Sequence, residues 1–171
     1  HTINSALDWV IIRLSEIYGI SEKEGVDFIL NRIKKMPFVP VIGNGEYSIA
    51  PLHISDAVSA INTIIEKDEI RNKIYTLAGP ENFTYNDFIE KIKALYGIKK
   101  IKIHIPVSIA SILLKTYVRT HKRNALWVTD QLPRLLSDKS YDISDAAKDL
   151  HFNPLSIEEF IRGSYSPNSA S

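Results

Sequence analysis

The sequence contains no cysteine and a single methionine, Met36. The lack of cysteine excludes disulfides, a thiolate nucleophile and a zinc ribbon, and it is typical of a reducing compartment. With no recognisable targeting signal, this composition leads us to expect a cytoplasmic protein. Because the chain starts at His1 and runs almost at once into a buried-strand pattern, we expect it to be the C-terminal portion of a longer protein.

An excess of charge of one sign is also missing. Lys and Arg number 21 against 20 Asp and Glu, a formal net charge of +1, which argues against general nucleic-acid binding. The longest apolar stretch, residues 101–114, is interrupted by Lys102, His104 and Pro106 and is shorter than the roughly 20 residues that span a bilayer. We therefore expect no nucleic-acid partner and no membrane span.

Glycine is scarce, with 7 residues, and none of them forms the G-x-G-x-x-G loop of a nucleotide-binding βαβ unit. Gly43 and Gly45 come closest, but Ser48 stands where the third glycine would fall, so we interpret them as a tight turn. The 5 histidines show no metal-ligand spacing, and we predict no metal site.

One Tyr-x-x-x-Lys spacing occurs, from Tyr96 to Lys100. On a continuous helix this spacing would let the lysine lower the pKa of a catalytic tyrosine. Gly97 lies between the two residues at an expected helix end, so we do not regard them as a catalytic pair. We assign no catalytic residue to this chain.

Extended segments alternate with helical ones along the chain. Residues 9–14 are apolar on both faces, the pattern of a strand in a covered parallel sheet, and residues 74–78 form a second strand. Between residues 101 and 105 isoleucine alternates with polar residues, which predicts a half-buried strand.

Helix starts are marked by side chains that cap a first turn. The expected caps are Ser21 with Glu24, Ser55, Thr84 with Asp87, and Ser156 with Glu159. In the helix from Ser55 to about Lys67, we expect Val58, Ile61 and Ile65 on one face. Pro106 starts a helix to about Arg119, Trp127 lies in a loop or short helix, and residues 129–136 are also expected to be helical.

This alternation predicts an α/β fold, with the C-terminal part of a Rossmann-type parallel sheet and a small, helix-rich substrate lobe. Residues 1–79 would be the remnant of the NAD(P)-binding Rossmann domain, with interleaved substrate-lobe segments. Residues 80–163 would form the substrate lobe, and residues 164–171 a flexible tail.

Two polar groups allow more than one interpretation. His53 and Asp56 could act as acid and base, although a strand end followed by a helix cap explains them more simply. The basic run that ends the helix after Pro106 comprises Lys115, Arg119, His121, Lys122 and Arg123. It is either a solvated helix end or a site for phosphate or anionic lipid.

Four segments, in the same order, resemble motifs of the extended short-chain dehydrogenase/reductases, the NAD-dependent epimerase/dehydratase family. Residues 6–19 resemble LDWTIIRPSxIYG, residues 51–61 resemble PVHVxDVAxAI, residues 75–85 resemble YxLGGPExxTY, and residues 149–154 resemble DLGFxP. The resemblance covers most of the chain, and it implies that the family's glycine-rich loop and catalytic Tyr-x-x-x-Lys would precede it.

Two positions depart from the sugar-nucleotide epimerases of this family. Glu16 stands where the epimerase pattern R-P-x-N-x-Y-G has an asparagine that contacts substrate, and Leu14 replaces the proline. Ile49 stands where an arginine would bind the substrate diphosphate. A carboxylate without that arginine repels a diphosphate, so the pattern is more similar to the atypical, nucleoside-diphosphate-sugar-epimerase-like branch, which is related to an accessory subunit of respiratory complex I.

The resemblance implies a cofactor, NAD or NADP, held by the parent protein and bound weakly or not at all by this chain alone. It places Arg13, Leu14, Ser15 and Glu16 at the nicotinamide end of the cleft. It also places Tyr18, His53 and Asp56 at the junction between the lobes.

Two functions remain open from the sequence. The parent is either an NAD(P)-dependent oxidoreductase or epimerase acting on a small-molecule substrate, or a non-catalytic NAD(P)-binding subunit, assembly factor or sensor. The strand at residues 9–14 would also expose an edge through which the chain could form a homo-oligomer.

Overall fold

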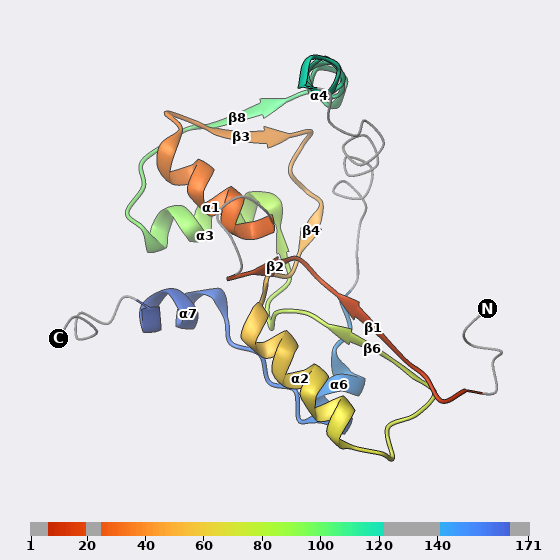
Figure 1. The fold of residues 1–171 in the computed structure, drawn as a ribbon. Helices are drawn as coiled ribbons and strands as arrows, with labels where there is room; N and C mark the ends of the chain where they lie inside the picture. The colour runs from red at the N-terminus through yellow and green to blue at the C-terminus, as the bar shows by residue number, and fades with distance from the viewer. Residues whose placement is uncertain (1–6, 20–24, 122–140, 165–171) are drawn as a thin grey trace. The chain divides into compact units, whose positions relative to one another are not determined.

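The computed structural model describes residues 7–19, 25–121 and 141–164, which belong to two compact units (Figure 1). The first unit comprises residues 1–31, 50–82 and 141–171, and the second comprises residues 32–49 and 83–140. Each unit therefore gathers segments that are distant in the sequence. The capping box at residues 21–24, Trp127 and the helix expected at residues 129–136 lie outside the described residues.

The first unit contains two pairs of parallel strands. β1 (Val10–Leu14) pairs with β6 (Lys73–Leu77), and β2 (Ile17–Tyr18) pairs with β5 (Leu52–His53). The two long strands run side by side in Figure 1, with α2 and α6 beside them. Parallel strands joined through helices confirm the α/β class predicted from the sequence. Whether β1 also recruits a second chain stays a prediction.

The core of the first unit lies where α2 (Ile54–Glu66) and α6 (Ser144–Leu150) pack beside β6. Its fully buried members include Leu52, Ala57, Tyr75, Leu77 and Ala146. A third helix of this unit, α7, spans Ile157–Ser164.

The apolar face expected for α2 is not the face that the helix buries. Val58 is 46% exposed and Ile65 is 74% exposed, whereas Ala57 and Ala60 are buried. Two small side chains on the buried face let a helix approach its neighbours closely. The larger β-branched residues then point away from the core, which simple hydrophobic periodicity does not reveal.

Hydrogen bonds to Asp149 join the end of α6 to β6. The Asp149 carboxylate accepts hydrogen bonds from Lys73 Nζ at 2.5 Å and from the Tyr75 hydroxyl at 2.9 Å. Lys67, which ends α2, donates to the backbone carbonyl of Asp149 at 3.2 Å. His151 is the C-cap of α6, and its φ of 54° lies in the left-handed region.

Three predicted helix starts can be compared with the structure. Thr84 caps α3 (Tyr85–Leu95) by accepting a hydrogen bond from the Asp87 amide, and Ser156 and Glu159 form the expected capping box, so both predictions are confirmed. The prediction for α2 is wrong by two residues. His53 is the N-cap, because its Nδ1 accepts from the Ser55 amide at 3.3 Å.

The second unit is built around a parallel pair of its own. β3 (Val39–Ile42) pairs with β8 (Lys102–Ile105), and β4 (Ser48–Ile49) pairs antiparallel with β7 (Phe83–Thr84). Helix α3 buries Phe88, Ile89 and Ile92 completely. The boundary between the two units falls within helix α1 (Gly25–Lys35), after Asn31. Helix α4 (Val107–His121) follows β8.

The strand predicted at residues 101–105 is confirmed as β8, but its isoleucines are not buried. Ile101 is 70% exposed and Ile103 is 39% exposed. Alternation gave the correct element because it reports the period of a strand, yet neither face of β8 is fully covered within the described chain. No described helix, α4 included, is both long and apolar enough to cross a membrane.

Candidate functional site

Four of the predicted site residues, Arg13, Leu14, Ser15 and Glu16, lie at the carboxyl end of β1. This strand is in register with β6 from Val10 opposite Lys73 to Leu14 opposite Leu77. In open parallel α/β sheets, ligands bind in the crevice beyond the carboxyl ends of the strands. The segment after β1 begins with Ser15 and Glu16, and the segment after β6 begins with Ala78 and Gly79. This end of the first unit is therefore the candidate functional site.

Arg13 and Leu14 form the last two residues of β1 and are both exposed. Successive side chains of a strand point to opposite faces, so the two lie on different sides of the β1–β6 pair. Leu14 is 45% exposed, which is high for a leucine at the end of a parallel strand. Both side chains are accessible to a ligand at this edge.

Ser15 continues the strand ladder and contacts the segment at Ala50. Its amide donates to the carbonyl of Leu77 at 3.0 Å, and its hydroxyl donates to the carbonyl of Ala50 at 2.6 Å. The hydroxyl proton is thus committed to a backbone carbonyl. Ser15 positions the chain and is poorly placed to act as a nucleophile.

The carboxylate of Glu16 accepts hydrogen bonds from the Tyr141 hydroxyl and from the Ala50 amide. The Tyr141 hydroxyl lies 2.9 Å and 2.8 Å from its two oxygens, and the Ala50 amide donates to Oε2 at 3.3 Å. Burial, followed by the nearby Glu16 carboxylate, raises the pKa of Tyr141, so the hydroxyl keeps its proton and donates. Glu16 consequently has a fixed structural environment at the end of β1.

The end of β6 approaches the same segment through Gly79. Its amide donates to the carbonyl of Ala50 at 3.3 Å. A Cβ at this position would lie 2.0 Å from the carbonyl oxygen of Pro51, a backbone atom that has little freedom to move. Close contact between the two segments therefore requires glycine.

Tyr18, His53 and Phe160 form a second cluster in the first unit. The ring centroids of Tyr18 lie 5.1 Å from His53 and 5.2 Å from Phe160, and His53 lies 4.2 Å from Phe160. Tyr18 is 1% exposed, and within the described chain its hydroxyl has no hydrogen-bond partner. Burial first, then Asp56 and Asp27, raise the pKa of Tyr18, so this phenol stays protonated and is not a general base.

Gly19 lets His53 approach this cluster. Its φ is 90°, and a Cβ would lie 2.5 Å from the His53 Nε2 atom. His53 caps α2 through Nδ1, and Asp56 accepts a hydrogen bond from the Leu155 amide at 3.0 Å. The structure has a strand end and a helix start here, as the simpler interpretation predicted, although the cap is His53 and not Ser55. The His53 ring contacts Phe160 of α7, and Asp56 binds the loop before α7.

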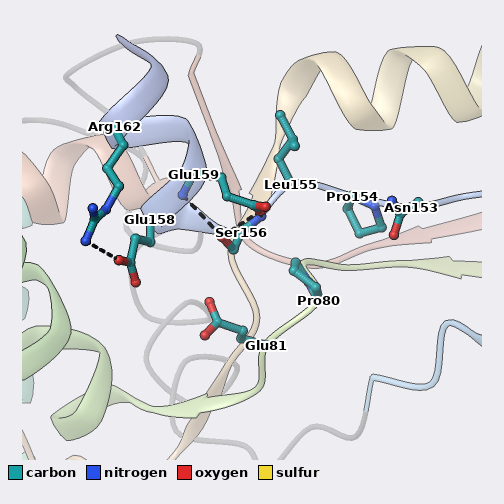
Figure 2. A pocket seen from close by; sticks show the side chains of 9 residues that line it. All are labelled: Pro80, Glu81, Asn153, Pro154, Leu155, Ser156, Glu158, Glu159 and Arg162. Atoms are coloured by element: carbon teal, nitrogen blue, oxygen red, sulfur yellow. Dashed lines mark hydrogen bonds and ion pairs between the residues drawn. The ribbon is translucent and has the colours of Figure 1, made fainter. Parts of the chain in front are cut away.

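The first unit has an open pocket of about 700 Å³ (Figure 2). Its lining comes from the segment after β6 and from the start of α7: Pro80, Glu81, Asn153, Pro154, Leu155, Ser156, Glu158, Glu159 and Arg162. Glu158 pairs with Arg162 at 2.7 Å, and Glu159 is engaged by Ser156. These charged groups therefore already have partners within α7.

The predicted residues thus fall into two groups with different environments. Arg13, Leu14, Ser15 and Glu16 share the end of β1, and Tyr18, His53 and Asp56 surround Phe160 and Leu155. None of the seven lines the pocket.

The sequence prediction missed Tyr141 and the pocket residues. Tyr141 lies 125 residues from Glu16, and no local pattern links the two. The capping box at Ser156 and Glu159 was visible in the sequence, but it signals only a helix start. In the described part of the chain, no group of three or more His, Asp or Glu side chains is placed to hold a metal ion.

The Tyr96–Lys100 spacing does not form a catalytic pair. Helix α3 ends at Leu95, and Lys100 Nζ donates to the carbonyl of Ile33 at 2.9 Å. The Tyr96 ring instead lies 3.9 Å from Lys34 Nζ. The interpretation drawn from Gly97 is confirmed, because a helix end separates the two residues.

No protein-family profile matches the chain. One curated protein from Dictyostelium discoideum, NADH dehydrogenase [ubiquinone] 1 alpha subcomplex subunit 9, mitochondrial, is 29% identical over 159 residues. That alignment covers 87% of this chain and 42% of the Dictyostelium protein.

Several solved structures share the fold. UDP-glucose 4-epimerase of Thermotoga maritima, solved with UDP-glucose, has a TM-score of 0.67 at 19% identity, covering 93% of this chain and 45% of the epimerase. The dTDP-glucose 4,6-dehydratase of Bacillus anthracis, in complex with NAD, has a TM-score of 0.62 at 14% identity, covering 90% and 42%. UDP-glucuronic acid 4-epimerase of Bacillus cereus, in complex with UDP-glucuronic acid and NAD, has a TM-score of 0.61 at 15% identity, covering 91% and 46%. The chain spans less than half the length of each of these proteins.

Proposed function

Since this chain has the short-chain dehydrogenase/reductase fold of the NAD-dependent epimerases and dehydratases, we propose that it is the C-terminal, substrate-side part of an NAD(P)-binding protein. In that protein the nucleotide is a structural or sensing ligand, and the protein acts as a non-catalytic subunit. The glycine-rich loop that binds the pyrophosphate would come from the part of the protein that precedes this chain.

The environment of Glu16 carries this proposal. The epimerase pattern has a substrate-binding asparagine at this position, whereas Glu16 is fixed by Tyr141 and by the Ala50 amide. An ionised carboxylate here repels the diphosphate of a nucleotide sugar, and its hydrogen bonds keep it from turning away.

A second position supports the same conclusion. Ile49, which stands where the epimerase pattern has a diphosphate-binding arginine, is 4% exposed and belongs to β4 of the second unit. It supplies no positive charge and no hydrogen-bond donor from its side chain. The described residues therefore offer neither of the two substrate contacts that distinguish a nucleotide-sugar epimerase.

Arg13, Leu14, Ser15 and Glu16 are proposed to line the nicotinamide end of the nucleotide site. Their position at the carboxyl end of β1 supports this, because parallel sheets bind ligands there. The similarity to a subunit of NADH dehydrogenase supports a role within a larger assembly.

The second candidate is an NAD(P)-dependent oxidoreductase or epimerase acting on a different small molecule. The shared fold with enzymes solved in complex with NAD favours it. A catalytic Tyr-x-x-x-Lys would then lie in the preceding part of the protein, and this chain would provide the substrate side of the cleft.

The experiment compares the 171-residue chain with the product of the complete coding sequence. Calorimetric titration with NADH and NADPH should give micromolar affinity for the complete protein and no measurable affinity for this chain. Micromolar binding by this chain alone would contradict the proposal that the nucleotide site needs the preceding part of the protein. Epimerisation of a UDP-sugar by the complete protein would contradict the non-catalytic role.

A matched pair of variants tests the role of Glu16 in the complete protein. Glu16→Asn introduces the residue of the epimerase pattern and should increase the affinity for UDP-glucose. Glu66→Asn, on the exposed end of α2, makes a comparable charge change away from the site and should leave that affinity unchanged. No gain from Glu16→Asn would show that Glu16 does not exclude the nucleotide sugar.

A further inference from the structure

The N-cap of α2 is a histidine ring, which is an unusual group in this position. His53 has an extended backbone, with φ of −72° and ψ of 140°, and its Nδ1 accepts a hydrogen bond from the Ser55 amide at 3.3 Å. The Ser55 hydroxyl lies 2.6 Å from the same nitrogen. The common caps are Ser, Thr, Asp and Asn, whereas histidine is the side chain type that changes charge between pH 5 and 8.

This cap depends on the protonation state of the ring. In a neutral imidazole with its proton on Nε2, Nδ1 is an acceptor, whereas both nitrogens of an imidazolium are donors. A protonated Nδ1 can still donate to the Ser55 hydroxyl, but it leaves the Ser55 amide without its acceptor. The imidazolium also lies at the N-terminus of α2, where the helix dipole disfavours a positive charge. Acid therefore removes the cap from the first turn of α2.

The capped turn is joined to the segment before α7. Asp56, in the first turn of α2, accepts a hydrogen bond from the Leu155 amide at 3.0 Å. The His53 ring itself lies 4.2 Å from the Phe160 ring of α7, centroid to centroid, at an angle of 33°. Leu155 lines the pocket of the first unit together with the start of α7 (Figure 2). A change at the cap can thus reach the pocket through two contacts.

Two carboxylates lie near the ring. Asp56 belongs to the same helix, and Asp27 of α1 accepts a hydrogen bond from the Gly19 amide at 2.7 Å, next to the His53 ring. Tyr18 of β2 contacts His53 at 5.1 Å, and burial, then Asp56 and Asp27, raise the pKa of this phenol, so it stays neutral. An imidazolium in this position is therefore not a charge without a counter-charge.

Helix α7 presents an uncharged group to the ring. Phe160 faces His53, whereas the charged side chains Glu158, Glu159 and Arg162 line the pocket. Glu158 and Arg162 pair with each other, and Glu159 accepts from Ser156. These carboxylates already have partners, so a proton taken up by the partly exposed ring acts on α7 through the cap and through Phe160.

We propose that His53 is a pH-sensitive switch that controls how firmly α2 holds the segment before α7. With a neutral ring, the capped first turn fixes Asp56, and Asp56 fixes the Leu155 amide. When the ring takes up a proton from solvent, the first turn loses its cap and frays, and the bond from Leu155 to Asp56 weakens. Loss of the proton restores the contacts, so the change is reversible. The proposal is independent of whether the nucleotide site is catalytic.

The test is amide hydrogen exchange, measured by NMR on the 171-residue chain at pH 7.5 and pH 5.5. Both values lie above the ordinary pKa of Asp and Glu, so the carboxylates stay ionised. After correction for the intrinsic exchange rate, protection of the Ser55 and Leu155 amides should fall about fivefold at pH 5.5, the equivalent of about 1 kcal/mol for an N-cap. The Ala147 amide, which donates to the Ile143 carbonyl at the start of α6, is the internal control and should not change.

Variants separate the proton from the cap. His53→Asn keeps an N-cap acceptor that does not titrate in this range, so protection at Leu155 should become independent of pH. His53→Ala lacks the cap at every pH, so its protection at pH 7.5 should be as low as that of the wild type at pH 5.5. His104→Asn, at an exposed histidine of the second unit, is the matched control and should keep the wild-type response.

Three results would overturn the proposal. The first is a pH response at Leu155 that survives in His53→Asn. The second is titration of the His53 ring, followed by its carbon chemical shifts, with no change in protection at Leu155. The third is a His53 ring that does not titrate between pH 5.5 and pH 7.5. The second and third are read on the wild-type chain and do not depend on the folding of a variant.

Discussion

The Tyr141 hydroxyl lies within hydrogen-bond distance of both carboxylate oxygens of Glu16, at 2.8 Å and 2.9 Å. The contact joins the second residue after β1 to the segment that precedes α6, 125 residues further along the chain. Within the first unit it fixes the carboxylate at the end of the sheet where a ligand would bind. The contact is therefore both a constraint on folding and a feature of the candidate site.

Removal of the Tyr141 hydroxyl should destabilise the chain. Tyr141→Phe leaves a partly buried carboxylate with one donor fewer, and a hydrogen bond to a charged group contributes about 1.5–3 kcal/mol. We expect the free energy of unfolding, measured by urea titration, to fall by about 2 kcal/mol.

Tyr18→Phe is the matched control for that experiment. The Tyr18 hydroxyl is buried and lacks a hydrogen-bond partner in the described structure, so its removal should be neutral or slightly stabilising. If the free energy of unfolding fell equally in the two variants, the hydrogen bond between Tyr141 and Glu16 would make no specific contribution to stability.

The close approach of Gly79 to the backbone of Pro51 leads to a second prediction. A Cβ there would lie 2.0 Å from the Pro51 carbonyl oxygen, so Gly79→Ala must displace the backbone and should destabilise the chain by more than about 3 kcal/mol. Gly163→Ala is the control, because no atom lies within 4 Å of a Cβ in that position of α7. It should stabilise by about 0.5–1 kcal/mol in thermal or urea unfolding. A tolerated Gly79→Ala would show that the two segments can separate at little cost.

The elements that local chemistry determines were predictable from the sequence. The parallel pairing of β1 follows from a strand that is apolar on both faces, and the Thr84 cap follows from the preference of hydroxyl side chains for the N-cap. The order of four motifs predicted the fold that the solved structures share.

The features that depend on distant residues were not predictable. His53, and not Ser55, is the cap of α2. Helix α2 buries Ala57 and leaves Val58 exposed, because the packing of a helix against its neighbours decides which face is buried. The partner of Glu16 comes from another part of the chain. Periodicity gives an element and its spacing, but it does not say which face finds a partner.

The left-handed conformation of His151 gives a third prediction. Its φ is 54° at the C-cap of α6, where the DLGFxP motif of the family has glycine. A side chain in this conformation costs about 1 kcal/mol, so His151→Gly should raise the free energy of unfolding by about that amount. His151→Ala removes the imidazole but keeps the Cβ, and it should give no such gain. A gain from alanine equal to that from glycine would assign the effect to the imidazole and not to the backbone.

Asp149 predicts how the stability of the first unit depends on pH. Its hydrogen bonds from Lys73 and then from Tyr75 hold the pKa of the carboxyl below its ordinary value, and the bond to Asp149 raises the pKa of Lys73. A carboxyl with a lowered pKa stabilises the fold above its ordinary pKa of about 3.9 and loses that contribution as the pH falls through the lowered value. The lysine contribution is present below its ordinary pKa of about 10.4 and is lost as the pH rises above it.

Asp149→Asn should therefore destabilise the chain by a constant amount across the neutral range, and the difference from the wild type should shrink below about pH 4 and above about pH 10. Urea unfolding at a series of pH values measures it, with Glu69→Gln as the exposed control that should show neither change. Because Asp149 also joins α6 to β6, the loss should appear in the same cooperative transition that unfolds the core. A difference that persists unchanged at pH 3 would mean that it does not come from the charge of the carboxylate, since the backbone contact with Lys67 is present in both proteins.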